Sequence, residues 1–498
     1  MFDFLLSEAA RLANAITIGK DRITDEQYIV NEINTFKLSR RRKEMLDGEK
    51  YYEGKHDILS RKRTMIGENG ELEEVKNLPN NRIVDNQYKK MVDQKNNYLL
   101  GQPISIQCEN EQYAKLLKKH VFNRKFQRLL KSLGEDSFNG GLGWLFPYYN
   151  ERGEFTFKRI RPFELIPGWK DAEHTTLDYA IRIYEVIAYE GRQEKVIQKV
   201  EVYDDKGITF FELTDGGSLK PVEPFRQNYF TITNEDGTET GYNWTKIPLI
   251  PFKYNAKEVP LIKMVKSLQD GLNLILSNFQ NNMEEDTRNT ILILKNYDGQ
   301  NLGEFRKNLA ALGAVKVRTV DGADGGVDKL TIEVNADNYK AIIEIFKKAI
   351  IENAMGYDAK DDRLQGNPNQ MNIQSMYSDI DLDANGMETE YQAAFEDLLW
   401  FINCHFANMG MGDFEGEEVE IIFNRDILIS EGEVIENVNK STDLSLETRL
   451  AQHPWVDDVQ AEMERIKKEK EEAVEQFDPS FNPAIDEDDE DVTEGKVM

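Results

Sequence analysis

Residues 371–408 constrain the fold of this chain more than any other stretch. Their apolar members recur at steps of three and four, which places them on one face of a helix. These members are Ile373, Met376, Ile380, Ala384, Met387, Tyr391, Phe395, Leu398, Ile402 and Phe406. The helix would be roughly 57 Å long, whereas globular helices average roughly 11 residues. It therefore needs an extended partner surface, from its own chain or from neighbouring copies, and Gly386 predicts a kink in its middle.

Two further helices and an insert precede this stretch. Residues 256–289 predict a helix, residues 290–334 a small β-containing insert, and residues 335–358 a second helix. In the first helix we expect a buried apolar face of Leu261, Val265, Leu268, Leu272, Ile275, Phe279 and Met283. We expect its wet face to carry Lys263, Lys266, Asp270, Asn273, Ser277 and Glu284. In the second helix, the expected apolar side is Ile342, Ile345, Phe346, Ala349 and Ile350, and the polar stripe is Lys340, Glu344, Lys347 and Lys348.

Residues 361–370 form a loop by composition. They lack apolar periodicity and contain both Gly366 and Pro368. On periodicity alone, the helices on either side of this loop could also form a helical hairpin inside a large globular domain.

The N-terminal part predicts three helices, over residues 24–53, 80–104 and 111–133. Asparagines start the second of these, and Gly101 and Pro103 stop it. The basic run at residues 40–43 either contacts nucleic acid or forms a solvated face or an inter-subunit salt bridge.

The middle of the chain, residues 154–255, predicts a β-rich subdomain because its apolar residues alternate or are β-branched and aromatic. The expected strands here and just before it are residues 144–149, 155–157, 179–186, 196–203 and 208–213. The prolines of residues 246–255 suit an edge strand or a linker. One more strand is expected at residues 418–423, and helices at residues 431–476. The fold class is therefore α+β.

The charge balance limits the classes of partner. The chain has 62 basic and 90 acidic residues, a net charge of −28, which argues against tight non-specific binding to nucleic acid. Its two cysteines, Cys108 and Cys404, predict neither a disulfide framework nor a metal site. No apolar run approaches the roughly 18 residues of a membrane span, and the N-terminus lacks the features of a secretory signal. We therefore expect a protein made and kept inside a cell.

Motifs for catalysis are absent from the sequence. There is no phosphate-binding G-x-x-x-x-G-K-[ST] loop, no H-E-x-x-H and no G-x-S-x-G, and residues 140–143 (GGLG) predict a plain turn. The strongest enzymatic alternative is a Mg²⁺-dependent nuclease in which Asp171 or Asp178 joins Glu194 and Lys195. Such combinations arise by chance in acidic proteins, so we expect no enzyme, cofactor or metal.

Four motifs in a fixed order carry a resemblance. They are residues 51–59 (YYEGKHDIL), residues 80–104, residues 247–252 (IPLIPF) and residues 367–375 (NPNQMNIQS). Together with the order of the elements, they resemble the portal, or head-to-tail connector, proteins of tailed double-stranded-DNA bacteriophages of the siphovirus type. The resemblance covers residues 28–470. The loop departs from some relatives, which have a serine-glycine junction where this chain has Asn367 to Gln370.

The resemblance implies a division of the chain into named parts. The wing comprises residues 1–255 and 371–430, and the stem comprises residues 256–289 and 335–358. The clip is residues 290–334, the tunnel loop residues 359–370, the crown residues 431–477, and an acidic disordered tail residues 478–498.

The resemblance also implies a function. A dodecameric ring would form the channel at one capsid vertex through which DNA is packaged and ejected, and it would be assembled in the host bacterial cytoplasm. Its partners would be the terminase large subunit, a head-completion or adaptor protein, the scaffold and the major capsid protein, with DNA bound weakly. The alternative is a scaffolding or other capsid-associated structural protein.

Three sets of site residues follow from the resemblance. The tunnel loop would face DNA with Arg363, Leu364, Gln365, Gly366, Asn367, Asn369 and Gln370. The stem would face the channel with Lys340, Lys347 and Lys348. The clip would contact partner proteins through Lys307, Lys316 and Arg318. The alternative for the tunnel loop is a passive connector.

Overall fold

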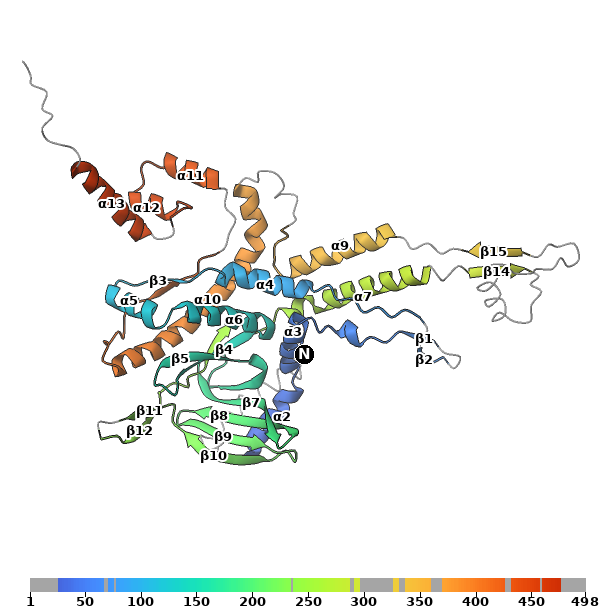
Figure 1. Cartoon of the computed structure of the whole chain (residues 1–498), viewed down its shortest axis with the longest axis horizontal. Coiled ribbons are helices and arrows are strands. Elements are labelled where there is room, and N and C mark those ends of the chain that lie inside the picture. Colours follow the sequence, from blue (N-terminus) through green and yellow to red (C-terminus); the bar gives the residue numbers. More distant parts are fainter. Residues whose placement is uncertain are drawn as a thin grey trace, which may run out of the picture. The chain divides into compact units, whose positions relative to one another are not determined.

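A computed structural model describes ten segments of the chain. They are residues 26–66, 70–75, 78–233, 236–286, 291–295, 326–330, 336–359, 370–425, 431–456 and 459–475. The chain divides into two compact units, one of residues 1–359 and 376–427 and the other of residues 360–375 and 428–498. Helices and strands both contribute (Figure 1), so the predicted α+β class is confirmed. No helix of the described segments combines the length and hydropathy of a membrane span.

The N-terminal helices correct two predictions. The helix expected at residues 24–53 is two helices, α2 (Glu26–Leu38) and α3 (Arg40–Tyr52). They are separated at Ser39, whose side chain accepts a hydrogen bond from the Arg42 amide and caps α3. The helix expected at residues 111–133 is also two helices, α5 (Glu111–His120) and α6 (Arg124–Gly140), with Asn123 as the N-cap of α6. In both cases a polar side chain caps the start of a new helix at a position where the apolar periodicity of the sequence continues without a break.

The helix expected within residues 80–104 is α4 (Gln87–Leu100), and its N-cap is Asn86. The stop at Gly101 is confirmed, but the helix begins after Asn86 rather than at Asn80 and Asn81, so residues 80–86 lie outside it.

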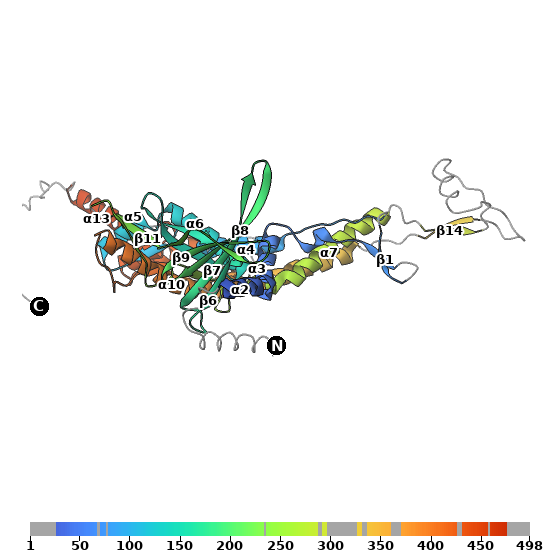
Figure 2. The same cartoon turned by 90° about the horizontal axis from the view of Figure 1, so that it is seen from below.

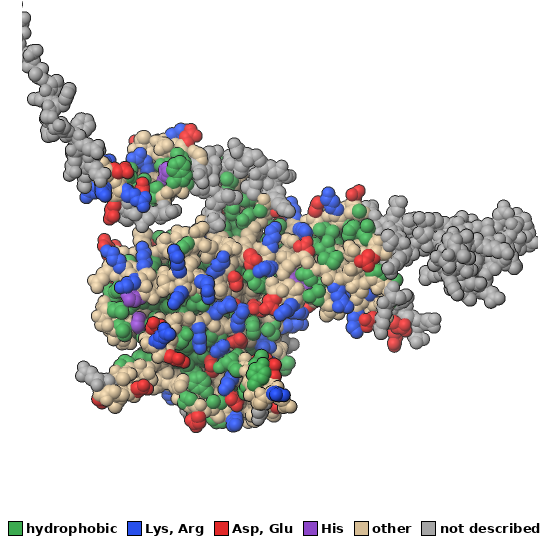
Figure 3. All heavy atoms as spheres, in the orientation of Figure 1, with side chains coloured by type: hydrophobic (Ala, Val, Ile, Leu, Met, Phe, Trp, Pro, Cys, Tyr) green, Lys and Arg blue, Asp and Glu red, His purple; other side chains and the backbone are tan. Residues whose placement is uncertain are grey.

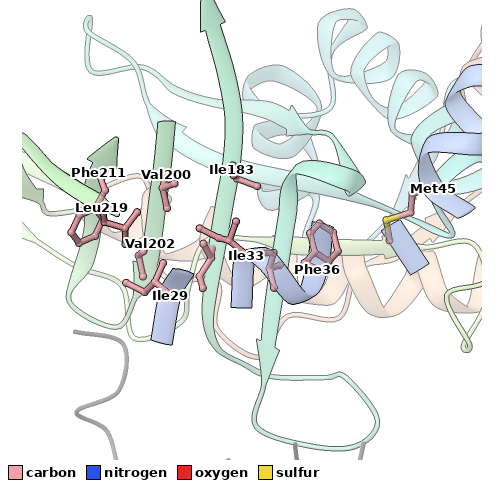
Figure 4. Close-up of a cluster of buried hydrophobic side chains, with 11 residues drawn as sticks. Ile29, Ile33, Phe36, Met45, Ile183, Val200, Val202, Phe211 and Leu219 are labelled. Atoms are coloured by element: carbon pink, nitrogen blue, oxygen red, sulfur yellow. The ribbon is translucent and has the colours of Figure 1, made fainter. Parts of the chain in front are cut away.

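A five-stranded antiparallel sheet has the order β10-β9-β8-β7-β6. Its strands are β6 (Leu165–Trp169), β7 (Leu177–Glu190), β8 (Gln193–Asp204), β9 (Gly207–Leu213) and β10 (Leu219–Gln227). One face packs against α2, and Figure 4 shows Ile29 and Ile33 of this helix meeting Ile183, Val200 and Val202 of the sheet. The predicted strands are confirmed, although β7 and β8 are several residues longer than expected.

A three-stranded sheet has the order β13-β4-β5, with β4 (Leu142–Tyr149), β5 (Phe155–Ile160) and β13 (Ile250–Lys253). β13 is an edge strand and contains Pro251, which confirms that prolines here mark an edge. Phe252 of this strand packs edge-on against Tyr391 and Phe395 of helix α10 (Gln370–Asn408), with ring centroids 5.0 and 5.4 Å away.

Four two-stranded sheets and two 3-10 turns complete the first unit as far as the structure describes it. The strand pairs are β1 (Thr64–Ile66) with β2 (Leu72–Glu74), β3 (Ser105–Gln107) with β16 (Glu420–Ile422), β11 (Phe230–Thr233) with β12 (Glu239–Tyr242), and β14 (Ile291–Lys295) with β15 (Gly326–Leu330). The turns are η2 (Asp57–Ser60) and η3 (Pro162–Glu164).

The three helices expected around the insert and the loop are present. They are α7 (Ile262–Asp286), α9 (Ala336–Asn353) and α10 (Gln370–Asn408). α10 begins one residue before the predicted start, and its expected apolar stripe is buried along its length. The helix continues through Gly386, so a kink there stays a prediction.

The second unit contains α11 (Glu431–Lys440), α12 (Leu446–Ala451) and α13 (Val459–Glu475), which confirms the predicted helical character. Trp455, next to α12, is 71% exposed. The expected acidic tail, residues 478–498, lies outside the described segments.

Candidate functional site: a polar ladder along α7

Four polar side chains recur every fourth residue along α7 and are almost completely buried. We call Gln269, Asn273, Ser277 and Asn281 the α7 ladder; their exposed fractions are 0, 0, 0 and 3%. Each accepts a hydrogen bond from a backbone amide of the segment that leads into α4. The donors are Tyr88 to Gln269 at 2.9 Å, Asp85 to Asn273 at 3.0 Å, Ile83 to Ser277 at 2.9 Å and Asn81 to Asn281 at 2.7 Å.

The match between the two partners follows from their repeat lengths. Four residues of helix rise about 6.0 Å, and two residues of extended chain advance about 6.6 Å. Alternate amides at residues 81, 83 and 85 can therefore meet successive turns of α7. The fourth donor, the Tyr88 amide, lies in the first turn of α4, where a helix leaves its amides without an intrahelical acceptor. Gln269 satisfies this amide and donates back to the Asp85 carbonyl at 2.7 Å.

The ladder corrects the expected wet face of α7. Asn273 and Ser277 were expected to face water, yet both are fully buried. The reason is that their partner is backbone rather than an apolar surface or solvent. The signal was available in the sequence as an uncharged Gln-Asn-Ser-Asn series at steps of four, because uncharged amides and hydroxyls can be buried when they are hydrogen-bonded.

The motif at residues 51–59 contacts the same ladder. Asn273 uses its amide group to donate to His56 Nδ1 at 2.8 Å, and His56 Nε2 lies 3.1 Å from the Tyr51 carbonyl oxygen. This arrangement fits a neutral imidazole that accepts at Nδ1 and donates at Nε2. Burial lowers the pKa of His56, and its ring stacks on Tyr51 with centroids 4.4 Å apart.

A charged cluster beside the ladder completes the attachment. Lys266 of α7 donates to the Tyr51 hydroxyl at 2.8 Å and to Asp57 at 2.5 Å. Burial opposes ionisation of Asp57, but hydrogen bonds from Lys266 and Lys50 lower its pKa overall. Tyr51 also donates to Asp270 of α7, and burial together with this bond raises the pKa of Tyr51. Two of the motifs that carry the resemblance, residues 51–59 and 80–104, therefore fix α7 to the rest of its unit.

A different side of α7 packs against α9. A Cβ atom on Gly271 would lie 2.6 Å from the Phe346 ring, so glycine permits this close approach. Further along, the rings of Phe279 and Tyr339 lie 4.9 Å apart, and Asn282 donates to the Tyr339 hydroxyl at 2.9 Å.

The apolar side expected for α9 is only partly covered. Ile345 is 65% exposed and Ile342 is 40% exposed, while Ile350 is buried. On α7, Met264 and Met283 are also exposed, at 53 and 46%. This corrects the expected buried position of Met283 and leaves apolar side chains of both helices facing solvent in the single chain.

The predicted stem lysines have different surroundings. Lys347 forms an ion pair with Asp85 at 2.8 Å, at the centre of the segment bound by the ladder. Lys348 lies 3.9 Å from Glu352 on its own helix, and Lys340 is exposed. Lys347 was predicted to face the channel, and the structure additionally gives it an ion-pair partner within its own chain.

The remaining predicted site residues lie almost entirely outside the described segments. This applies to Arg363, Leu364, Gln365, Gly366, Asn367 and Asn369 of the predicted tunnel loop and to Lys307, Lys316 and Arg318 of the predicted clip. Gln370 is the first residue of α10.

The part of α10 within the first unit is anchored by buried charge. Lys95 of α4 lies 2.6 Å from Asp383, which also accepts from the Tyr254 hydroxyl at 2.8 Å. Burial lowers the pKa of Lys95 against the opposing effect of Asp383. On either side of Asp383 along α10, Asp381 and Glu388 pair with Arg425 at 2.9 and 2.6 Å. Removing Asp383 would leave the buried Lys95 ammonium unpaired.

The structure separates the residues of the nuclease alternative. Asp171 accepts from the Thr175 and Thr176 amides at 2.9 and 2.8 Å, and Asp178 lies at the start of β7. Glu194 and Lys195 lie at the opposite end of the β7–β8 ribbon, opposite Tyr189 and Ala188. Ten residues of strand span about 33 Å, so these carboxylates cannot share one ion. Among the described residues, no group of three or more potential ligands is placed to hold a metal.

The basic run at residues 40–43 is used within the chain. Arg40 pairs with Glu44 at 2.8 Å, Arg41 with the buried Glu258, and Arg42 donates to the Phe163 carbonyl at 3.1 Å. Salt bridges are therefore part of its role, although they are intrachain. Another basic surface is visible over α5 and α6 in Figure 3, where exposed cations gather although the chain as a whole is acidic. Lys115 pairs with Glu111 at 3.2 Å, and five more exposed cations lie on the two helices. They are Lys118, Lys119, Arg124, Lys125 and Arg128.

Comparison with known proteins adds an independent observation. The sequence model of the family described as "Phage portal protein, SPP1 Gp6-like" matches residues 36–476. The portal protein of Bacillus phage SPP1 is 28% identical over 429 residues, which cover 85% of this chain and 83% of the relative. The portal protein of Clostridium phage phiCD119 is 27% identical over 436 residues, covering 84 and 91%. Among solved structures, the neck of an empty GTA particle has a TM-score of 0.41 at 12% identity, covering 73% of this chain and 89% of its own.

Proposed function

The chain belongs to the SPP1 Gp6-like family of phage portal proteins, and from this premise we propose that its copies close into a ring around a channel for double-stranded DNA. The ring stands at one vertex of the capsid, is dodecameric, and is assembled in the cytoplasm of the host bacterium. Genomic DNA enters through it during packaging and leaves through it at ejection.

The exposed apolar side chains of α7 and α9 are the observation that supports assembly best. Ile342, Ile345, Met264 and Met283 are each 40% exposed or more. Apolar side chains grouped on long helices mark surfaces that another protein covers. In a ring, the same two helices of the next copy supply that cover, because every copy offers both halves of a repeated interface. Together α7 and α9 thus form the stem, and the α7 ladder fixes the stem to the wing of its own chain.

Weak binding suits the passage of DNA through such a channel. The net charge of −28 per chain repels phosphates, and each phosphate that a protein neutralises adds affinity and slows sliding.

The work of packaging comes from a separate motor, the terminase large subunit, which docks on the clip at residues 290–334. A head-completion or adaptor protein later takes the same place. The scaffold and the major capsid protein contact the ring from the capsid.

The tunnel loop, residues 359–370, is the part that we assign to DNA. Its polar side chains and Arg363 can exchange hydrogen bonds with the backbone of DNA, each contributing only about 1 kcal/mol in water. DNA is therefore held loosely and released as it advances.

The three clip cations Lys307, Lys316 and Arg318 serve motor docking, so their joint reversal to Glu should weaken terminase binding in a pull-down while rings still form. Unchanged binding would remove them from the docking surface.

Variants of the tunnel loop test this function. Deleting residues 365–369, or changing Arg363→Glu, should leave ring formation and incorporation into procapsids intact while the amount of packaged full-length genome falls at least tenfold. Arg363→Lys, which keeps the charge, is the matched control and should package as the wild type does. If Arg363→Glu and the deletion also package and retain full genomes, the loop is a passive connector.

A further inference from the structure

The β7–β8 ribbon extends well beyond the sheet to which it belongs. β7 and β8 pair with each other as far as Glu190 and Gln193. On either side the support ends earlier, because β6 pairs with β7 only up to Arg182 and β9 pairs with β8 only from Gln198. Residues 186–197, which we call the hairpin tip, therefore pair only with each other among the described strands. Figure 2 shows the tip projecting away from the other elements above the β8 label.

The hairpin tip carries apolar side chains on one face. Ile187 lies opposite Val196, and Tyr189 lies two residues further along the same face of β7. Their exposed fractions are 58, 53 and 71%. An isolated two-stranded hairpin is at best marginally stable in water. Because this one also exposes its apolar residues, it requires a partner surface.

A groove lies at the other end of the same strands. Its volume is about 1000 Å³, and its walls include Leu177–Tyr179 of β7 and Asp204–Lys206 at the end of β8, together with parts of α2, β6, β13 and α10. Trp169 lines it, stacked between Trp144 at 5.9 Å and His174 at 4.9 Å. The Trp169 Nε1 atom is buried and has no hydrogen-bond acceptor among the described residues.

The hairpin tip of a chain cannot reach its own groove. Tyr179 at the groove and Tyr189 at the tip are ten residues apart on one strand, or about 33 Å. In Figure 2 the tip points to the top of the view, whereas β6 and α2, which line the groove, lie on the opposite side. A projection at one end and a recess at the other are the two halves of a head-to-tail contact, the type that closes identical copies into a ring.

We propose that the hairpin tip of one copy docks in the groove of the adjacent copy. The proposal rests on the proposed ring and assigns one of its interfaces. The apolar face of Ile187, Tyr189 and Val196 meets the groove at the half-buried Trp169, beside which the nearly buried Phe36 and Ile166 also line the groove. Arg192, in the turn of the hairpin, meets the carboxylates of Asp171 and Asp178, which line the same groove.

Photocrosslinking from the tip tests this contact in the full chain. Tyr189→p-benzoylphenylalanine is placed in rings assembled from equal parts of ¹⁵N-labelled and unlabelled protein. Irradiation should link different copies, and mass spectrometry should map mixed-isotope links to residues 165–179 or 245–251. The matched control is Tyr242→p-benzoylphenylalanine on the β11–β12 hairpin, which is also exposed, at 43%, and should give no link to these segments. Links from the tip to other segments only, or no links in well-formed rings, would overturn the proposal. Failure of the wild type to form rings would instead contradict the proposed function.

A second variant pair measures how much the contact contributes. Ile187→Ser with Val196→Thr should raise the protein concentration at which half of the chains are in rings by at least tenfold, since both side chains leave an apolar interface. Lys195→Thr, on the other face of the tip, should leave that concentration unchanged. Circular dichroism should be the same for all three proteins, because the changed side chains are exposed in the single chain. Equal ring formation by the double variant and the wild type would contradict the assignment.

Discussion

Polar side chains are usually exposed and apolar side chains buried, but the α7 ladder and the exposed apolar side chains of the stem show the opposite. Gln269, Asn273 and Ser277 are polar and fully buried, whereas Met264 and Ile345 are apolar and more than half exposed. The difference reflects the two kinds of partner. The polar ladder binds the backbone of its own chain through directional hydrogen bonds. The exposed apolar side chains are the surface that we propose a second copy covers.

This difference also separates two functions in one helix. Buried hydrogen bonds specify a single register of α7 against residues 81–88, because a shifted register would leave amides unpaired. Apolar contacts are less directional and tolerate small adjustments between neighbouring copies. The stem is thus fixed rigidly to its own wing and more adaptably to the next subunit.

Breaking the ladder should have the largest effect on the folded chain. Gln269→Leu leaves the buried Tyr88 amide without its acceptor and removes one of the two donors to the Asp85 carbonyl, which the Gln87 amide still contacts. The orphaned amide and the lost bond together cost about 2–4 kcal/mol. The midpoint of urea unfolding, followed by tryptophan fluorescence, should fall accordingly. Gln280→Leu changes an exposed glutamine on the same helix and should move the midpoint very little. Equal midpoints for the two variants would show that the ladder does not stabilise the stem.

Separating α7 from α9 should have the next largest effect. Gly271→Val places methyl groups where the Phe346 ring already lies, and overpacking of this kind costs about 1–3 kcal/mol. The melting temperature should fall. Gly386→Val is the matched control, because no atom lies within 4 Å of a Cβ at that helical glycine. If both variants melted together, the close contact between the two helices would be wrong.

Changing the exposed apolar side chains should affect assembly rather than folding. Ile342→Ser with Ile345→Ser removes two isoleucines that are exposed in the single chain, so the free energy of unfolding should change by less than about 1 kcal/mol for the two substitutions. Ring formation, measured by sedimentation, should weaken by about tenfold or more, since burying one such side chain contributes about 1.5–3 kcal/mol. Glu344→Ser on the same helix serves as the control. Normal rings from the double variant would place the subunit interface elsewhere.

The smallest expected effect concerns pH. His56 is buried and neutral against Asn273, and burial lowers its pKa. The unfolded chain therefore binds this proton more readily, with an unfolded pKa of about 6.5. The stability that depends on neutral His56 is present above that value and is lost as the pH falls below it.

Comparing the unfolding free energy of the wild type and His56→Gln isolates this group. The wild type should lose up to about 1.4 kcal/mol more per pH unit below pH 6.5 than the variant. His405, whose pKa is lowered to about 4 by burial, contributes in the same direction to both proteins and cancels. Parallel pH profiles would mean that His56 does not hold a neutral place in the ladder.

The sequence predicted elements better than it predicted their contacts. The bounds of α10 were predicted within one residue because its apolar stripe is long and regular. The breaks at Ser39 and Asn123 were missed, because apolar periodicity continues across both and only the capping side chain marks the end. The extension of β7 and β8 beyond the five-stranded sheet was also missed. The alternation of apolar residues marks a strand, but it does not show where the neighbouring strands β6 and β9 end.

The candidate site was partly within reach of the sequence. Residues 51–59 and 80–104 were singled out as motifs, but their common partner on α7 was not, because Asn273 and Ser277 fit the polar face of any amphipathic helix. An ion pair such as Lys347 with Asp85 joins residues 262 positions apart and depends on the tertiary fold. Such contacts cannot be derived from periodicity.

The mass of the purified full-length assembly, measured by native mass spectrometry at micromolar protein concentration, shows whether the copies assemble as proposed. The proposed ring predicts one dominant assembly with the mass of many chains, twelve for the ring of the virion. A stable monomer at these concentrations would contradict it, because the exposed apolar side chains of α7 and α9 would then have no neighbouring copy to cover them.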